Sequence, residues 1–283
     1  MNHKKSLQEL TIKDNFMFGA VFLNPENCKG VLERSLDIQI DRVEVSKEKS
    51  IVYNPEFKGI RLDVYAKDEK NTHYNVEMQV LKRAALQKRA RYYHSQIDME
   101  NLLSGLPYEN LPNTYVIFIC DFDPYGKGKY RYTRECKCKE VPELDMDDGS
   151  HTIFLSTKGT NKHEVSEDLV NLLEFLGLSL SESEKDFDDA FVKKLQATVR
   201  EVKKSREMGA RYMTFQELLN DERAEGRAED RRQVIMEFLE DLGNVPNELQ
   251  EKLSKETDMN VLKLWSKIAA KAESIQQFME DIR

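Results

Sequence analysis

The pattern of apolar and polar positions changes its period along the first part of the chain. Residues 12–22 and 27–38 carry apolar side chains at helical spacing, and Asp14 stands where the first of these helices would begin. Alternation with a period of two follows and predicts three strands, over residues 40–47, 58–68 and 73–80. Because residues 67–71 have the composition of a turn, we expect the last two strands to form a hairpin.

Helical and strand patterns are unequally distributed over the rest of the chain. Residues 82–104 have a helical pattern, whereas apolar runs at 113–123 and 150–158 predict strands, the first of them buried on both faces. The remaining pattern is helical, with one or two long charged helices and then two shorter ones, over residues 187–242 and 246–282. The sequence therefore predicts a mixed α/β domain in residues 1–180 and a charged α-helical region in residues 181–283.

Composition narrows the class of protein. The chain has 283 residues, of which 40% are hydrophobic, and this is ordinary for a globular protein. No apolar run approaches the roughly 18 residues of a membrane span, and the first 15 residues lack the apolar core of a secretory signal. Four cysteines are too few for a disulfide scaffold, and the pair Cys136 and Cys138 lacks a second pair at zinc-finger spacing. We therefore expect reduced thiols, a cytoplasmic location and no membrane partner.

The net charge of -8 argues against nucleic acid as a partner, but the charge is unevenly distributed. Residues 1–135 carry 21 Lys+Arg and 19 Asp+Glu, whereas residues 136–283 carry 22 and 32. Phosphate groups respond to the field near their site rather than to the charge of the whole chain. Overall acidity therefore does not exclude a nucleic-acid site in the first half.

Three polar side chains stand at positions that would face one spot. Asp63 lies between two apolar residues of its strand, and Glu77 and Gln79 share one face of the next strand. Folding the hairpin at residues 68–71 would bring Asp63 nearly opposite Glu77. Two ionised carboxylates at short range need a compensating cation, and a hard ion such as Mg²⁺ accepts oxygen ligands of this kind. A hairpin whose polar face is merely in contact with water is the alternative interpretation.

A basic and aromatic segment follows at once. Lys82, Leu86, Arg89 and Tyr93 have the spacing of one continuous helix face. Cations beside a carboxylate-bound metal ion suit a phosphodiester backbone. A solvated basic face is again the alternative, although it is less persuasive beside the hairpin.

Five motifs in this order resemble the PD-(D/E)XK nuclease superfamily, in particular its transposase-like branch of recombination-promoting nucleases. They are TIKDNFMF, RLDVYAKD, NVEMQV, RARYYHSQ and SGLPYENLPNTYVIFICDFD, and the resemblance covers roughly residues 8–160. The charged ERAEGRAEDRR segment at 222–232 is similar to helices common near the C-termini of such proteins. The resemblance implies a restriction-endonuclease-like mixed β-sheet core flanked by helices.

The same resemblance implies roles for individual residues. Asp63 and Glu77 would be the metal carboxylates, with Asp14 as a candidate third ligand or a plain helix cap. Gln79 occupies the place of the superfamily's lysine, as is usual in this branch, and could orient water but not deprotonate it. The implied cofactor is Mg²⁺, with Mn²⁺ or Ca²⁺ as other candidates. The side chains expected to contact the DNA backbone are Lys82, Arg89 and Tyr93.

Two functions remain open at this level. The first is metal-dependent DNA endonuclease activity in a recombination, mobile-element or defence setting. The second is a catalytically inactive module of the same fold that binds DNA or another protein. We also expect a homodimer, because nuclease domains that cut both strands often work in pairs. The C-terminal helices could supply its contacts or pack against their own domain, through Leu239, Leu242, Leu262, Trp265 and Ile268.

Overall fold

The computed structural model describes residues 5–51, 60–144 and 146–282. Two compact units divide the chain, Met1–Gly209 and Ala210–Arg283. The first contains a six-stranded sheet with helices on both faces, and the second is helical. The predicted α/β class with a helical C-terminal region is therefore confirmed.

The sheet is mixed, in the strand order β1-β2-β3-β4-β6-β5. Antiparallel pairing joins β1 to β2, β2 to β3 and β5 to β6, whereas β3, β4 and β6 run parallel to one another. The strands are β1 (Val43–Ile51), β2 (Ile60–Asp68), β3 (His73–Gln79), β4 (Thr114–Cys120), β5 (Arg131–Arg134) and β6 (Ser150–Ser156). Because β4 lies between two parallel neighbours, its near-continuous apolar sequence is buried on both faces, as predicted.

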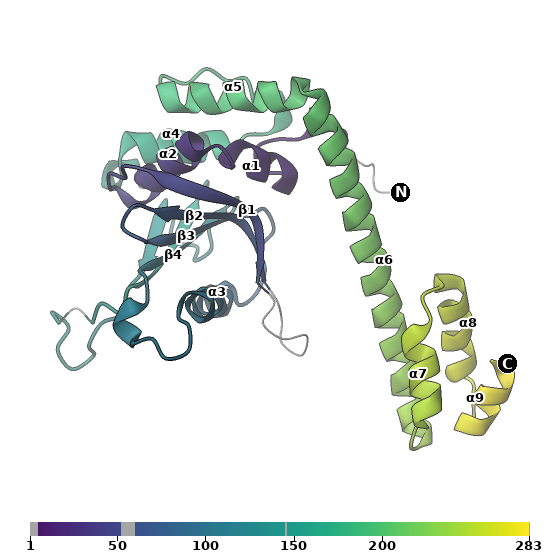
Figure 1. Ribbon diagram of the computed structural model, residues 1–283. Helices are drawn as coiled ribbons and strands as arrows, with labels where there is room; N and C mark the ends of the chain where they lie inside the picture. Colours follow the sequence, from purple (N-terminus) through teal and green to yellow (C-terminus); the bar gives the residue numbers. More distant parts are fainter. Residues whose placement is uncertain (1–4, 52–59, 145, 283) are drawn as a thin grey trace. The chain divides into compact units, whose positions relative to one another are not determined.

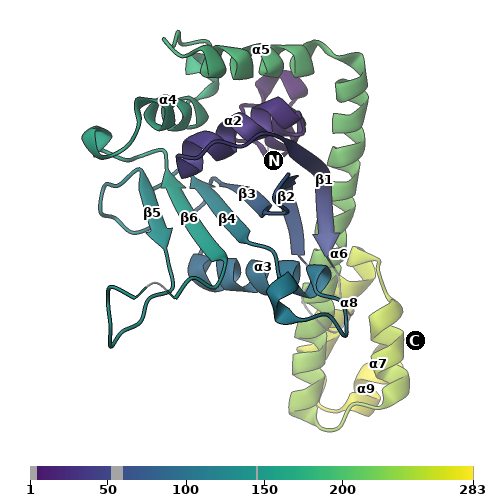
Figure 2. The same cartoon turned by 60° about the vertical axis from the view of Figure 1, so that its left-hand side comes forward.

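Helices cover both faces of the sheet (Figures 1 and 2). On one face lie α1 (Asn15–Phe22), α2 (Pro25–Leu36) and α4 (Glu167–Leu176), and α5 (Ala190–Lys204) packs on the outer side of these helices. The opposite face is covered by α3 (Leu86–Asn101), which connects β3 to the parallel strand β4. Short 3₁₀ turns occur at Leu7–Glu9, Tyr108–Asn110, Lys162–Glu164 and Leu180–Glu182.

The helix α3 packs on the sheet because its apolar residues recur at helical spacing. Leu86, Ala90, Tyr93 and Ile97 are buried and form one core cluster with side chains of β4 and β6. The ring of Tyr93 stacks on Phe118 of β4, with their centroids 6.0 Å apart. Burial of each large apolar side chain stabilises the fold by about 1.5–3 kcal/mol. This contact fixes the position of the helix that carries Arg89.

The second unit has a core of its own. It contains the end of α6 (Arg206–Leu242) together with α7 (Asn247–Lys255), α8 (Met259–Ala269) and α9 (Ile275–Asp281). Leu239, Leu262 and Trp265 are buried in this core, and Leu242 and Ile268 pack against it. The five side chains proposed for self-association are thus used inside the unit.

Several predicted boundaries differ from the observed ones. The helix predicted for residues 82–104 begins only at Leu86, after Ala85 with a left-handed backbone, so Lys82 lies outside it. Residues 246–282 form three helices rather than two, and the four-residue strand β5 has too short a pattern to be recognised. Residues 58–59 of the second predicted strand lie outside the described residues. The compact units divide after Gly209, whereas the domain boundary predicted from the sequence follows residue 180 and stays a prediction.

The helices were also compared with what a membrane span requires. Within the described ranges, none combines the necessary length with sufficient apolar character.

Candidate active site

The hairpin of β2 and β3 sets the position of the two predicted carboxylates. Its turn is fixed by Asp68, whose carboxylate accepts hydrogen bonds from the N–H of Lys70 at 2.9 Å and of Thr72 at 2.8 Å. The same carboxylate accepts the hydroxyl of Tyr74 at 2.8 Å. A turn held in this way allows one register, and a slip of one residue would turn every side chain to the other face.

Asp63 and Glu77 are neighbours across that hairpin. Val64 and Val76 are the paired residues furthest from the turn, and each predicted acid stands one position further from the turn than these. The backbone N–H of Asp63 donates to Oε1 of Glu77 at 3.2 Å, and the N–H of Met78 donates to Oδ2 of Asp63 at 3.2 Å. The predicted proximity of the two acids is confirmed.

Arg89 connects the hairpin to α3. Its guanidinium donates to Oε2 of Glu77 at 2.8 Å and to the amide oxygen of Gln79 at 2.9 Å. Its Nε donates to the hydroxyl of Tyr93 at 3.0 Å. A planar guanidinium with several donors suits this arrangement, in which one side chain spans two acceptors on one strand face. The structure therefore brings Glu77, Gln79, Arg89 and Tyr93 together.

The electrostatics of Glu77 are unusual for a carboxyl group. Burial raises its pKa to about 8, and the nearby charge of Asp63 acts in the same direction. Arg89 and the hydrogen bonds from the Asp63 backbone and the Asn75 side chain lower the pKa but do not outweigh burial. The side chain is 2% exposed, so solvent does little to stabilise its charge. An additional cation beside Glu77 would favour its ionised form.

The chemistry of these donors fits a hard divalent cation. Asp63 and Glu77 are neighbours across the hairpin, Arg89 joins Glu77 to the amide oxygen of Gln79, and all three side chains offer oxygen ligands. Mg²⁺ keeps several of its waters, so a pair of carboxylates is a sufficient protein contribution. Among the described residues, no group of three or more His, Cys, Asp or Glu side chains is placed to hold a metal ion.

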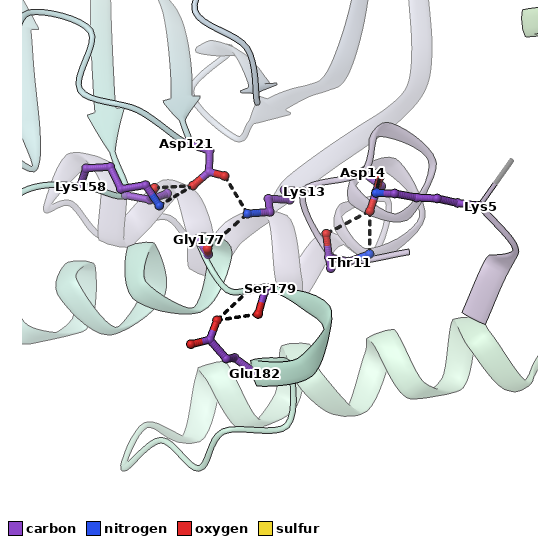
Figure 3. Close-up of polar contacts among 10 residues, drawn as sticks. Lys5, Thr11, Lys13, Asp14, Asp121, Lys158, Gly177, Ser179 and Glu182 are labelled. Carbon is purple, nitrogen blue, oxygen red and sulfur yellow. Dashed lines mark hydrogen bonds and ion pairs between the residues drawn. The ribbon is translucent and has the colours of Figure 1, made fainter. Parts of the chain in front are cut away.

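The carboxylate of Asp14, the candidate third metal ligand, contacts residues near its own position in the chain. It precedes α1 at the cap position, but its side chain makes no capping hydrogen bond. The carboxylate instead accepts the N–H and hydroxyl of Thr11, at 2.7 and 3.0 Å, and pairs with Lys5 at 2.6 Å (Figure 3). Its role as a third metal ligand stays a prediction.

Lys82 is exposed in the segment between β3 and α3. The prediction that it shares a helix face with Arg89 is wrong, because the helix begins four residues later. Its contact with the DNA backbone stays a prediction.

Two residues near the site were missed by sequence reasoning. Asn75 is fully buried, and its amide donates to Oε1 of Glu77 at 3.3 Å. Asp121 follows β4, and its backbone N–H donates to the carbonyl of Gln79 at 2.9 Å. The Asp121 side chain pairs with Lys13 at 2.6 Å and Lys158 at 2.9 Å (Figure 3). The alternation of β3 marks Asn75 as sharing the face of Glu77, but no sequence signal identifies the partners of Asp121.

Comparison with known families agrees with this arrangement. The family described as PD-(D/E)XK nuclease family transposase matches residues 13–229. The chain belongs to this family. The mixed six-stranded sheet flanked by helices is consistent with the PD-(D/E)XK nuclease fold, and the resemblance inferred from the motifs is confirmed. Searches of curated proteins and of solved structures found no match.

Family membership indicates a nuclease-type function with DNA as the substrate class. PD-(D/E)XK nucleases generally use divalent metal ions, in accord with the oxygen donors of the hairpin.

Proposed function

We propose that this protein is a metal-dependent DNA endonuclease that hydrolyses phosphodiester bonds with a metal-activated water. The observation that carries the proposal is the contact of Asp63 and Glu77 across the β2–β3 hairpin, beside Arg89 and Gln79. The proposed setting is DNA recombination, a mobile element or defence, in the cytoplasm. The four cysteines suit a reducing compartment.

In the proposed mechanism, Asp63 and Glu77 would hold Mg²⁺, or Mn²⁺ or Ca²⁺ in its place. A divalent cation at this position supplies Lewis-acid activation of water and offsets charge that develops at phosphorus. Gln79 orients the attacking water by hydrogen bonding, and its neutral amide takes no proton from that water. The function of Gln79 is therefore positional.

Arg89, Lys82 and Tyr93 would contact the DNA backbone. Arg89 donates to Oε2 of Glu77 in this structure, and Glu77 would no longer depend on that donor if a cation were bound beside it. The guanidinium would then pair with phosphate oxygens, for which its fork of N–H donors is well suited. The hydroxyl of Tyr93 would keep the side chain in place through the bond to Nε.

A plasmid-cleavage assay with Mg²⁺ tests the proposal. We expect Asp63→Ala and Glu77→Ala to lower cleavage by at least about a hundredfold, because each removes a proposed cation ligand. Glu77→Gln retains the shape of the side chain and should show the same loss. Glu143→Ala, at an exposed position, is the matched control and should cleave like the wild type. Unchanged cleavage in either alanine variant would contradict the assignment.

A second candidate function is supported by the same guanidinium. Arg89 already donates to one oxygen of Glu77 and to the oxygen of Gln79, so these two proposed site residues have a partner in the absence of a metal ion. DNA binding without turnover in Mg²⁺, Mn²⁺ and Ca²⁺ would favour this catalytically inactive module. Turnover in any of them would exclude it.

We also propose a homodimer, because a cut through both strands needs two active sites or two successive events. Light scattering over a concentration series tests this proposal. A dimer mass that persists on dilution is the expected result, and a monomer at every concentration would contradict it.

A further inference from the structure

The connection from β4 to β5, residues 121–130, lies next to the end of β3. Its first residue, Asp121, donates its backbone N–H to the carbonyl of Gln79. The strands β3, β4 and β6 are parallel, so the segments that follow them lie at one edge of the sheet. Ligands of open α/β sheets bind outside the carboxyl ends of such strands. The connection is therefore placed where a substrate of the candidate site would pass.

The carboxylate of Asp123 holds this connection in one conformation. Its two oxygens accept the backbone N–H groups of Tyr125, Gly126 and Gly128, at 3.0, 2.9 and 2.7 Å. They also accept the hydroxyl of Tyr132 at 2.7 Å. Gly126 and Gly128 both have a φ of 68°, which side chains other than glycine rarely adopt. Four donors on one carboxylate thus tie the backbone of this loop to a single side chain.

Aromatic packing places the loop on the sheet face that carries the candidate site. Tyr125 meets Phe154 edge to face, with their centroids 5.5 Å apart. Phe154 stacks on Phe118 at 5.6 Å, and the guanidinium of Arg89 lies 5.3 Å from the centre of the Phe118 ring. A continuous row of contacts thus runs from the loop to Arg89.

The exposed cation of the loop is Lys127, between the two glycines. Its backbone N–H donates to the hydroxyl of Tyr132 at 3.2 Å, which anchors the residue below its side chain. Lys129 pairs with Glu164 at 2.6 Å, whereas Lys127 makes no ion pair within the described parts of the chain. The carboxylate of Asp123 is occupied by its donors. Lys127 therefore presents an uncompensated charge at this edge.

We propose that residues 121–130 form a preformed contact for the DNA backbone, with Lys127 as its phosphate-binding cation and Asp123 as its positioning residue. This inference rests on the proposed function, since it takes DNA as the substrate. A rigid loop loses little conformational entropy when it binds, so that one cation on it contributes more than one on a mobile segment. A lysine acts on phosphate as a point charge and carries no sequence preference.

The salt dependence of DNA binding tests the role of Lys127. The full-length chain carries Glu77→Gln so that DNA stays intact, and anisotropy of a labelled duplex in Mg²⁺ is measured over a series of NaCl concentrations. Lys127→Gln should lower the slope of log K against log salt by about 0.9, and the affinity at moderate salt by roughly three- to tenfold. Lys139→Gln removes an exposed charge beyond β5 and should leave the slope unchanged.

Asp123→Ala separates positioning from charge. We expect Asp123→Ala to weaken DNA binding. Loss of a negative charge would by itself strengthen binding to a polyanion, so weaker binding would have to come from the loosened loop. Tyr132→Phe removes one donor to Asp123 without a change in charge and should weaken binding in the same direction. Far-UV circular dichroism and thermal unfolding establish that both variants are folded.

The outcomes distinguish this inference from the proposed function. An unchanged slope in Lys127→Gln overturns the inference even if the wild type cleaves DNA. A lowered slope supports it even if no cleavage occurs in any metal ion. Binding as tight as that of the parent chain in folded Asp123→Ala and Tyr132→Phe overturns the positioning role. Absence of DNA binding by the parent chain overturns both proposals.

Discussion

Glu77 is an acid whose two oxygens have different partners. Oε1 accepts from Asn75 and from the backbone of Asp63, whereas Oε2 accepts only from Arg89 among the hydrogen bonds described above. The two sets of partners differ in kind, because the first is neutral and the second carries charge. Removal of the charged partner should therefore change the ionisation of Glu77 more than its orientation.

We predict that Arg89→Gln destabilises the metal-free protein by about 1–3 kcal/mol, because it removes the charged donor to a buried acid. The loss of stability is limited because Glu77 can take up a proton, and a neutral carboxyl group costs less to bury than an unpaired carboxylate. Urea unfolding in the presence of a chelator measures the change. Arg91→Gln, at an exposed position on the same helix, should leave the free energy of unfolding nearly unchanged.

The buried ring of His94 should make the stability of the protein depend on pH. Its ring lies between the hydroxyls of Thr114 and Thr152, at 2.8 and 3.1 Å. Burial, together with the charge of Arg134, lowers its pKa to about 4. Between the ordinary pKa of about 6.5 and this value the unfolded chain binds a proton that the folded chain does not. The contribution of His94 therefore falls as the pH falls through this range.

We expect the wild type to lose about 2 kcal/mol more than His94→Gln when the pH is lowered from roughly 7 to 5. Comparing the two chains cancels the groups that titrate in both, including Glu77, whose raised pKa acts in the opposite direction. Denaturant unfolding at the two pH values measures the difference. An equal loss in both chains would show that the ring is not held neutral.

At the scale of residues, sequence reasoning succeeded where the partners are close in the chain. Asp63, Glu77 and Gln79 were placed together from alternation and one turn, both of which are local. The bonds of Arg89 to two side chains of β3 depend on how a helix packs, which alternation does not specify. The cations that pair with Asp121, Lys13 and Lys158, likewise come from segments distant in the chain.

Packing between elements depends on close approach at particular glycines. Gly30 of α2 faces the ring of Phe191 at the start of α5, and an added Cβ would overlap that ring. Arg34, one turn further along α2, lies over the same ring at 4.2 Å from its centre. Gly19 of α1 has no atom within 4 Å of such a Cβ. The two helical glycines therefore provide a matched pair.

We predict opposite effects of the same substitution at these sites. Gly30→Ala should lower the free energy of unfolding by about 1–2 kcal/mol, because overpacking outweighs the gain in helix propensity. Gly19→Ala should raise it by up to about 1 kcal/mol, because only the propensity changes. Thermal unfolding followed by circular dichroism measures both. A stabilised Gly30→Ala would mean that α2 and α5 can separate without loss.

The elements themselves were predictable to different degrees. Strands β2, β3, β4 and β6 have strong local patterns and lie close to their predicted ranges. The start of α3 was not predictable, because the left-handed backbone at Ala85 ends the extended segment and no glycine marks it. Strand β5 was not predictable, because its four residues are too few to show an alternating pattern. It is defined by its antiparallel pairing with β6.

At the scale of the whole molecule, the chain's one tryptophan belongs to the second unit. Trp265 is 7% exposed and packs among Leu262, Phe278 and other side chains of that core. Its emission therefore reports on the C-terminal helices alone. Far-UV circular dichroism, in contrast, reports on both units.

We predict that Leu262→Ala lowers the stability reported by Trp265 emission by about 2–5 kcal/mol, because Leu262 is fully buried and its truncation leaves a cavity. Leu264→Ala changes the same residue type on the same helix at a position that is 56% exposed. It should shift the transition little. Equal shifts in both variants would contradict the core assigned to the second unit.

The order of the elements along the chain has a consequence for synthesis on the ribosome. The acids and Arg89 lie in β2, β3 and α3, and the strands that flank and cover them end with β6 at Ser156. The helical layer on the other face is complete with Lys204 at the end of α5. Translation is slow relative to the folding of most domains, and domains tend to fold as they emerge. The candidate active site can therefore form while α7, α8 and α9 are still untranslated, so a nascent chain would carry its proposed chemistry before its C-terminal unit exists.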